Sequence, residues 1–318
     1  FQPMYGSIVL EMVSDSPAGE ILGETTKEYV FEACGEKLDM AQLQEIWEGK
    51  LEPVYPYRKA GPTVEKINGS LTAPAAPKIG VAKPKVIIPV FPGTNCEYDT
   101  AKAFARAGAD PEILVVRNLT PADVAESCKA LVKAIDASQI VMLPGGFSGG
   151  DEPDGSAKFI ASFFRSPAVT EAVRDLLQHR DGLMLGICNG FQALIKLGLV
   201  PYGDIRPITS YDPTLTFNTI GRHQSMLVRT RIASTGSPWL SNCAVGDEHT
   251  VAISHGEGRF VAPQNVLDEL VRNGQVATQY VDLDGQPTMD QRYNPNGSLL
   301  AIEGITSPDG RVFGKMGH

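Results

Sequence analysis

Cysteine is scarce in this sequence: its 318 residues include five cysteines, scattered, odd in number and without a Cys-x-x-Cys pair. This pattern argues against a disulfide framework and against a zinc site of the usual spacing, so we expect no metal. Clusters of lysine and arginine are also lacking, and the net charge of -9 disfavours a nucleic-acid surface. No apolar run reaches the length of a membrane span and no signal peptide opens the chain, so we expect a cytoplasmic protein without membrane contact.

Both ends of the chain look cut. The sequence opens with Phe1 close to a strand-like run, and it stops at 315–318 without a closing helix or polar tail. Residues 1–58 contain too few elements for an independent core. We therefore expect this first part to be the remnant of a domain that belongs to a larger protein.

Within the first part, the patterns predict strands at 7–12 and 20–23 and a helix at 40–48. Asp39 is suited to cap that helix, because its carboxylate can accept from the free N–H groups of the first turn. Residues 59–84 are rich in Pro, Gly, Ala, Ser and Thr and poor in large apolar residues. That composition indicates a linker.

Residues 85–318 have a different sequence pattern, in which short, continuous apolar runs alternate with helical patterns. The runs predict strands at 86–91, 112–117, 140–143 and 183–187, and the helices are expected at 98–107, 121–134 and 159–178. Continuous apolar strands that alternate with helices indicate a doubly wound, mostly parallel α/β sheet covered on both faces. After about residue 205 the pattern adds further strands, at 225–232, 250–254 and 276–281.

The most informative stretch surrounds Cys188. The apolar run 183–187 leads into Cys188 between Gly186 and Gly190 and then directly into a helical pattern. Flanking glycines permit a sharp strand-to-helix turn that would expose the thiol at a helix N-terminus, where a thiolate is stabilised. A nucleophile is the favoured interpretation, and the alternative is a small apolar residue packed at a strand end.

A glycine-rich loop, 144–151, follows the strand expected at 140–143. It is not a phosphate loop, because no Gly-Lys-Ser/Thr follows it. Backbone N–H groups near Gly146 could instead stabilise an oxyanion beside Cys188, which requires donors about 3 Å from the oxygen. The alternative is a tight turn between strand and helix.

A thiolate nucleophile needs a base, and the chain offers five histidines. By pattern alone, His255 is favoured, because it follows a strand and carries Glu257 as a possible orienting group. His318 is the last residue of the chain, and pattern alone would dismiss it. His179, His223 and His249 fit structural or solvated positions better.

Five motifs together resemble the glutaminase part of the phosphoribosylformylglycinamidine synthases in their large single-chain form, which are class I (triad) glutamine amidotransferases. They occur in the family's order across residues 85–318, and the fold that they imply is flavodoxin-like. The motifs are Phe91-Pro-Gly-Thr-Asn-Cys-Glu97, Leu143-Pro-Gly-Gly-Phe-Ser148, Leu185-Gly-Ile-Cys-Asn-Gly-Phe-Gln192, Ser254-His-Gly-Glu-Gly-Arg-Phe260 and Gly314-Lys-Met-Gly-His318.

The resemblance implies that Cys188 attacks the glutamine side-chain amide, forms a glutamyl thioester and releases ammonia. It also implies that His318 is the base, with the acidic third member of the triad beyond the end of this chain. Gly146 and Asn189 would then stabilise the oxyanion. The substrate-binding set implied by the resemblance is Gly145, Phe147, Gln192, His255, Glu257, Gly258, Arg259 and Phe260. Two departures from the family pattern are Gly149-Gly150 in place of Tyr-Gly and Gly317 in place of Pro.

The resemblance also implies the partners. Glutamine is the substrate of the glutaminase domain, 85–318, and the synthetase domain of the same polypeptide receives the ammonia. Residues 1–58 resemble the end of that synthetase domain. ATP and Mg would be used there to convert formylglycinamide ribonucleotide to the amidine, whereas residues 85–318 would need no cofactor. The complete enzyme would be a carbon–nitrogen ligase of purine biosynthesis.

Two other functions stay open. One is a cysteine hydrolase or peptidase of a related elbow fold, which Gln192, four residues after the nucleophile, disfavours. The other is a non-catalytic domain that docks the synthetase and regulates it. The presence of both Cys188 and His318 argues against that second function.

Overall fold

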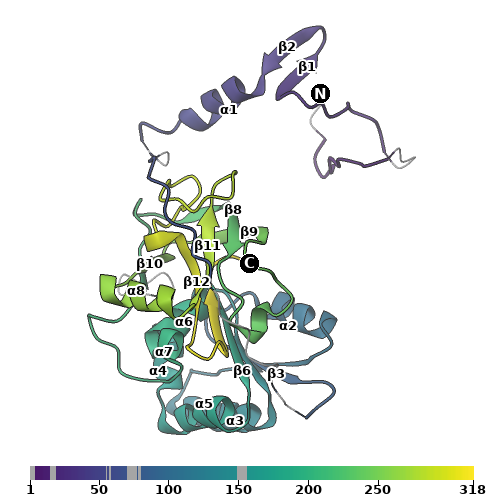
Figure 1. Ribbon diagram of the computed structural model, residues 1–318. Coiled ribbons are helices and arrows are strands. Elements are labelled where there is room, and N and C mark those ends of the chain that lie inside the picture. The colour runs from purple at the N-terminus through teal and green to yellow at the C-terminus, as the bar shows by residue number, and fades with distance from the viewer. Residues whose placement is uncertain are drawn as a thin grey trace. The chain divides into compact units, whose positions relative to one another are not determined.

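The computed structural model describes residues 4–14, 19–54, 56, 59–69, 77, 80–148 and 156–318. The chain divides into two compact units, Phe1–Pro56 and Tyr57–His318, and Figure 1 shows the elements of each. Each unit is described by itself.

The first unit contains a hairpin followed by a helix. Strand β1 (Val30–Ala33) pairs antiparallel with β2 (Glu36–Asp39) through a turn in which both Cys34 and Gly35 have positive φ, 54° and 82°. Helix α1 (Met40–Gly49) follows at once. The Asp39 carboxylate accepts from the N–H groups of Ala41 and Gln42 at 2.8 and 3.1 Å, which confirms the predicted cap.

The strands predicted at 7–12 and 20–23 are wrong. In the described residues of both stretches the chain forms no strand, and its apolar side chains are exposed, with Ile8 at 82% and Leu22 at 62%. A strand needs a neighbour to satisfy its N–H and C=O groups, and neither stretch has one here. An apolar run is therefore not sufficient for a strand.

The second unit is built on one sheet to which nine strands of the described chain contribute, in the order β4-β3-β5-β6-β13-β12-β11-β8-β9. The first five strands run parallel, and every pairing from β13 onward is antiparallel. The strands are β3 (Lys85–Val90), β4 (Asp110–Val115), β5 (Ile140–Leu143), β6 (Leu183–Ile187), β8 (Gln224–Ile232), β9 (Glu248–His255), β11 (Val276–Val281), β12 (Ile302–Thr306) and β13 (Val312–Lys315). Strands β7 (Thr214–Thr216) and β10 (Arg259–Val261) form a separate pair.

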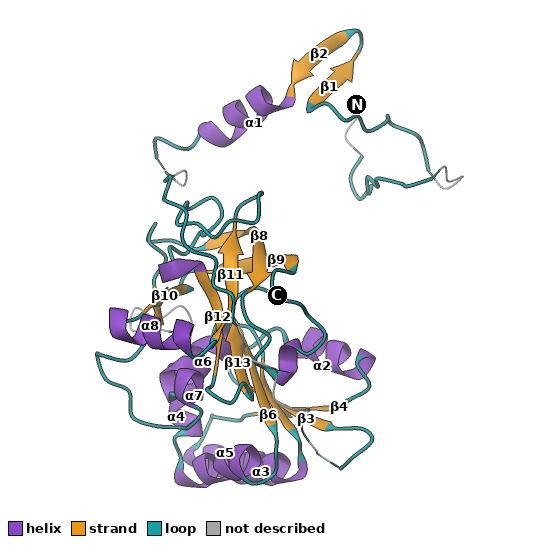
Figure 2. Ribbon diagram, viewed as in Figure 1, coloured by secondary structure: helices purple, strands orange, loops and turns teal. Residues whose placement is uncertain are grey.

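Helices cover both faces of the parallel half. On one face Leu131 of α3 (Pro121–Ala137), Leu176 of α5 (Pro167–Gln178) and Leu194 of α6 (Asn189–Leu197) are fully buried against the alternate residues of β3 and β5. The opposite residues of the same strands pack against α2 (Glu97–Arg106), whose Phe104 meets Trp239 edge to face. Figure 2 shows α3 and α5 side by side below the sheet. This arrangement confirms the predicted doubly wound core with extra strands.

The remaining elements are short. They are α4 (Lys158–Phe164), α7 (Leu199–Tyr202), α8 (Gln264–Arg272) and the 3-10 turns η1 (Pro238–Leu240) and η2 (Leu299–Ala301). The single helix predicted at 159–178 is in fact α4 and α5, because Pro167 disfavours a helical conformation at Ser166 and then starts a new helix. Strands β12 and β13 were not predicted, although β13 lies in the centre of the sheet between β6 and β12.

Part of the predicted linker packs against the second unit. The Ile67 side chain is buried, its N–H donates to the Gln279 side chain at 3.0 Å, and its carbonyl accepts from Arg231 at 2.7 Å. The Val64 N–H donates to the Pro287 carbonyl at 2.8 Å. Residues 59–69 are thus an extended strap on the antiparallel end of the sheet. The composition indicated a linker, and it gave no sign of this docking.

Candidate active site

Cys188 lies at the junction of β6 and α6, in the strained turn that the sequence predicted. Its φ and ψ are 52° and -106°, a conformation that non-glycine residues rarely adopt. The side chain is buried, so the predicted exposure of the thiol is wrong. The next turn of the chain is tight, because a side chain at Gly190 would collide with the carbonyl oxygen of Leu143. Glycine at position 190 therefore lets α6 start directly beside β5.

Two hydrogen bonds fix the strained residue. The Cys188 N–H donates to the Lys315 carbonyl of β13 at 2.8 Å, and the Cys188 carbonyl accepts from the Gln192 N–H at 3.0 Å, in the first turn of α6. The thiol is thus held at a helix N-terminus, where the helix dipole stabilises a thiolate.

The glycine-rich loop lies against the loop that follows β3. Gly146, with φ 150°, pairs with Thr94, and the Phe147 N–H donates to the Gly93 carbonyl at 2.8 Å. A side chain at Gly146 would press on the Thr94 backbone, so the two loops can approach only because that position is glycine. The Phe147 ring lies 5.9 Å from the His223 ring. Residues 149–151 of the predicted loop lie outside the described residues.

A chain of buried hydrogen bonds links the elbow to the segment 255–260. The Asn189 side-chain oxygen Oδ1 accepts from the Ser148 N–H at 3.2 Å, and the Asn189 side-chain amide donates to Gln192 Oε1 at 2.9 Å. The Gln192 amide then donates to the Glu257 main-chain carbonyl at 2.7 Å. One carboxylate oxygen of Glu257 accepts from the Ser156 N–H at 2.8 Å, whereas the other is buried and has no hydrogen-bond partner among the residues that the structure describes.

His318 follows β13 and lies at the same edge of the sheet as the Cys188 elbow. Its N–H donates to the Ala252 carbonyl at 3.0 Å, and its Nε2 is 3.6 Å from the Cys96 sulfur. A side chain at Gly145 would touch both the His318 ring and the Cys96 sulfur. Although part of the residue reaches solvent, burial of the ring lowers the pKa of His318, and the charge of Lys315 lowers it further.

His255 is held differently, and Glu257 does not orient it. The Nε2 of His255 is 2.8 Å from Asn296 Oδ1, and the Asn296 amide donates to the Tyr280 hydroxyl at 2.8 Å. Its Nδ1 is buried and has no hydrogen-bond partner in the described part of the chain. Burial lowers the pKa of His255 to about 4. The pairing of His255 with Glu257 that the pattern favoured is wrong, because the intervening turn directs the two side chains to different partners.

The backbone of 258–260 is also engaged. The Gly258 N–H donates to Asn218 Oδ1 at 3.3 Å, and the Phe260 N–H donates to the Ser298 hydroxyl at 3.1 Å. Arg259 pairs with Thr216 across β10 and β7, and its Nε is buried with no hydrogen-bond partner among the described residues. Two of the three main-chain N–H groups of residues 258–260 are therefore already hydrogen-bonded within the protein.

Comparison with known proteins identifies this arrangement. Residues 83–318 match the model of the CobB/CobQ-like glutamine amidotransferase domain. The chain belongs to this family. The predicted resemblance to a glutamine amidotransferase is thereby confirmed.

Several curated relatives of this amidotransferase domain carry the name phosphoribosylformylglycinamidine synthase subunit PurQ. The protein of Methanococcus maripaludis is 34% identical over 239 residues, 74% of this chain and 81% of the relative. That of Mycolicibacterium paratuberculosis is 38% identical over 235 residues, 74% of this chain and 86% of the relative. Among solved structures, PurLQS from Thermotoga maritima matches with a TM-score of 0.52 and 25% identity, covering 74% of this chain and 87% of that one.

Several residues of the amidotransferase site were not predicted from the sequence. Cys96 was quoted within a motif but given no role, although its sulfur faces His318. Asn296 and Tyr280, which hold His255, were also overlooked. The Asn294-Pro-Asn-Gly turn was the available signal for Asn296, whereas Tyr280 looked like any other core residue of a strand.

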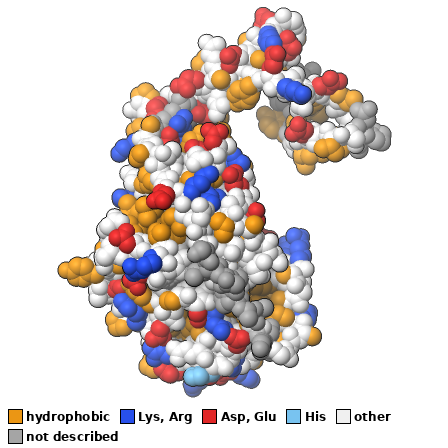
Figure 3. Space-filling view, in the orientation of Figure 1, with side chains coloured by type: hydrophobic (Ala, Val, Ile, Leu, Met, Phe, Trp, Pro, Cys, Tyr) orange, Lys and Arg blue, Asp and Glu red, His pale blue; other side chains and the backbone are white. Residues whose placement is uncertain are grey.

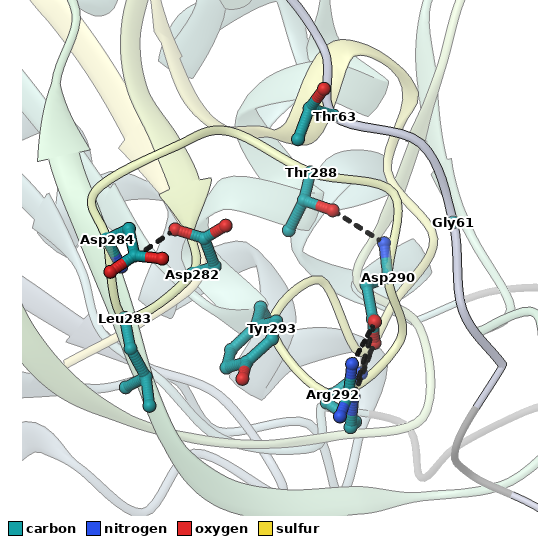
Figure 4. Close-up of a pocket in the computed structure, with 9 residues that line it drawn as sticks. All are labelled: Gly61, Thr63, Asp282, Leu283, Asp284, Thr288, Asp290, Arg292 and Tyr293. Carbon is teal, nitrogen blue, oxygen red and sulfur yellow. Dashed lines mark hydrogen bonds and ion pairs between the residues drawn. The ribbon is translucent and has the colours of Figure 1, made fainter.

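A cavity of about 440 Å³ lies elsewhere in the second unit (Figure 4). Two of its acidic groups are used internally: Asp290 pairs with Arg292 at 2.6 Å, and Asp282 accepts from the Asp284 N–H at 2.9 Å. It includes none of the predicted site residues, so we do not assign it to the amidotransferase site. It is lined by Gly61, Thr63, Asp282, Leu283, Asp284, Thr288, Asp290, Arg292 and Tyr293.

The surface of the domain carries both signs of charge. Figure 3 shows Lys and Arg interspersed with Asp and Glu on the visible face. In the described part of the chain, no helix is long and apolar enough to span a bilayer. Nor does that part contain a group of three or more His, Cys, Asp and Glu side chains placed to hold a metal ion.

Proposed function

We propose that this chain is the glutaminase part of a phosphoribosylformylglycinamidine synthase. Cys188 adds to the side-chain amide carbon of glutamine, the carbon–nitrogen bond breaks, and ammonia leaves with a proton from the base. The resulting glutamyl thioester is cleaved by water, which releases glutamate and restores the thiol. The curated relatives named PurQ support this proposal, and the strained elbow at Cys188 is the observation that carries it.

We assign the base to His318 and the oxyanion donors to Gly146 and Asn189. His318 follows β13, the strand that accepts the Cys188 N–H, and so it belongs to the same edge of the sheet. Asn189 supplies the first N–H of α6, and Gly146 lies in the neighbouring loop. Donors of this kind stabilise the developing oxyanion by about 3–4 kcal/mol each.

Glutamine would be held between the glycine-rich loop and the segment 255–260. The unpartnered oxygen of Glu257 is suited to the α-ammonium group, because a buried carboxylate oxygen without a partner is costly unless a ligand satisfies it. Gln192 fixes the backbone of Glu257. We place Gly145, Phe147, His255, Gly258, Arg259 and Phe260 around the same ligand.

The ammonia would be used by a synthetase part on the same polypeptide. That part would bind ATP and Mg and convert formylglycinamide ribonucleotide to formylglycinamidine ribonucleotide, and the first unit would be its remnant. We infer that the complete enzyme works in the cytoplasm.

The test is Cys188→Ala in the enzyme assembled with its synthetase. Glutamine-dependent synthesis should be lost while synthesis from an ammonium salt survives, because only thioester formation needs the thiol. Cys243→Ala, which removes a half-buried thiol outside the site, is the matched control and should retain both activities. Loss of both activities in folded Cys188→Ala protein would contradict the proposal.

A glutamine-derived chloroketone separates the alternatives. A glutaminase should be labelled at Cys188, a peptidase should react instead with a peptide chloroketone, and a docking domain should react with neither.

A further inference from the structure

A buried ion pair lies beneath the segment that carries His318. Glu303 is on β12 and its side chain is fully buried, and Lys315 is on the neighbouring strand β13. Lys315 Nζ is 3.6 Å from Glu303 Oε1, and the Thr278 hydroxyl donates to Glu303 Oε2 at 2.5 Å. Neither charged residue belongs to the catalytic or substrate-binding set assigned above.

Both members of the pair hold the same residue. The Gly317 N–H donates to Glu303 Oε1 at 2.6 Å, and the Gly317 carbonyl accepts from Lys315 Nζ at 2.5 Å. The next N–H, that of His318, donates to the Ala252 carbonyl of β9. The Gly317 N–H, the Gly317 carbonyl and the His318 N–H are therefore bonded to residues of β12, β13 and β9, respectively.

Position 317 has no room for a side chain. A side chain at Gly317 would collide with Val251 and press on the Glu303 carboxylate. The backbone therefore lies directly on the pair. Burying two charges costs several kcal/mol each, and an apolar pair of similar size often stabilises a fold equally well or better. Stability alone is therefore a weak reason for a charged pair at this place.

The pair also sets the electrostatic environment of the imidazole. Burial lowers the pKa of His318 and the hydrogen bond to the Met316 carbonyl raises it; within the pair, Lys315 lowers this pKa and Glu303 raises it. The other titratable groups that face the ring are the Cys96 thiol, from the loop after β3, and His255, at the end of β9. Of these charged groups, Glu303 is the one whose charge favours an imidazolium.

We propose that Glu303 and Lys315 are positioning residues for His318. They hold the Gly317–His318 backbone and balance the charge around the ring, so that His318 can accept the thiol proton and carry it as an imidazolium. This inference rests on the proposed function, in which His318 is the base.

The test compares Glu303→Gln with Lys315→Met in the enzyme assembled with its synthetase, by glutamate release from glutamine across pH. A base must be neutral to act, so activity falls on the acidic side of its pKa. Glu303→Gln removes the anion, lowers the pKa of His318 and should move the acidic limb to lower pH by roughly half a unit to one unit. Lys315→Met should move the limb to higher pH.

We also expect Glu303→Gln to lower kcat by about tenfold with KM for glutamine nearly unchanged, because the imidazolium forms only during the reaction. Lys315→Arg, which keeps the charge, should leave the limb in place. Gln275→Leu is the structural control, because the Gln275 amide is buried and bonds the Pro201 and Thr306 carbonyls away from His318. It should lower stability without moving the limb.

Limbs that stay at the wild-type pH in both Glu303→Gln and Lys315→Met, with folding confirmed by circular dichroism, would overturn the inference. The failure of the proposed function looks different: the wild-type enzyme itself would then release no glutamate and take no chloroketone label at Cys188.

Discussion

The N–H of Cys188 donates to the carbonyl of Lys315 at 2.8 Å. This bond extends the parallel pairing of β6 and β13 by one residue, so the elbow and the segment that carries His318 leave the sheet at the same edge. In a parallel sheet the C-terminal strand ends face the ligand site. Two residues from distant parts of the sequence thus reach one site through the pairing of neighbouring strands.

The close contact between α6 and β5 predicts a strong effect of Gly190→Ala. The added methyl group would overlap the Leu143 carbonyl, which belongs to a central strand and cannot move freely. We expect a loss of about 2–3 kcal/mol in the free energy of unfolding, measured by urea denaturation. Gly23→Ala, where a side chain would meet no atom within 4 Å, should leave stability almost unchanged. Equal stability of Gly190→Ala and wild type would mean that the elbow is looser than the structure indicates.

Much of the parallel half could be predicted from the sequence. Strands β5, β6 and β11 have the predicted bounds, and Thr120 and Asp123 form a reciprocal cap at the predicted start of α3. These predictions succeed because buried parallel strands are continuous apolar runs and because caps depend on neighbouring residues only. The elbow was predictable for the same reason, since its glycines lie within two residues of Cys188.

The missed strands show where local pattern fails. In β12 the run Ile302–Thr306 is interrupted by Glu303, whose charge is compensated by Lys315 of another strand. In β13 Gly314 weakens the apolar pattern, because the Phe191 ring of α6 occupies the space of a side chain there. Both effects depend on contacts with other elements of the fold, and the local sequence of each strand could not show them. The same holds for Asn296, which replaces Glu257 as the partner of His255.

The buried His255 predicts that stability depends on pH. Its pKa is about 4 in the folded protein and close to 6.5 when unfolded. The folded state therefore resists protonation, so the stabilisation is complete above about pH 6.5 and is lost as the pH falls towards 4. Between pH 7 and pH 5 this residue alone should lower the free energy of unfolding by about 2 kcal/mol.

The measurement is urea denaturation at several pH values for wild type and His255→Asn. The variant should show a shallower slope between pH 7 and pH 5, although some slope remains because the pKa of His318 is also lowered. Identical slopes for the two proteins would contradict the assigned burial of a neutral His255.

Cys96 should influence the base without being a nucleophile. Its thiol donates to Asn95 Oδ1 at 3.1 Å, so its sulfur faces His318 Nε2 as an acceptor. Burial raises the pKa of the Cys96 thiol, which keeps it protonated at neutral pH. Cys96→Ala removes an acceptor for the imidazolium, so the pKa of His318 should fall and the acidic limb of the glutaminase profile should move slightly to lower pH.

Cys96→Ser keeps an acceptor at the same place and should behave like wild type in that profile. Chloroketone labelling provides a second measurement, since Cys188 and not Cys96 should carry the label. A Cys96→Ala enzyme with no glutaminase activity would instead make this thiol part of the chemistry.

The sharpest prediction is that His318, not His255, is the base. His255 Nε2 is bonded to Asn296, and with a pKa of about 4 its neutral ring is a weak proton acceptor at neutral pH. His318 follows the strand that binds Cys188. Burial lowers the pKa of His318, and the Met316 carbonyl and the Glu303 charge act against that lowering. Removing a general base lowers the rate by about 10²–10⁴-fold.

We therefore expect His318→Ala to reduce kcat for glutamate release by at least about a hundredfold while ammonia-dependent synthesis continues. His255→Asn should keep kcat within about tenfold of wild type and act mainly on KM, because its ring supports the segment that would hold glutamine. A hundredfold loss of kcat in His255→Asn, together with an active His318→Ala enzyme, would reverse the two roles. These two variants decide between His255, which the local pattern favoured, and His318, which the pairing of β6 with β13 brings to the same edge of the sheet as Cys188.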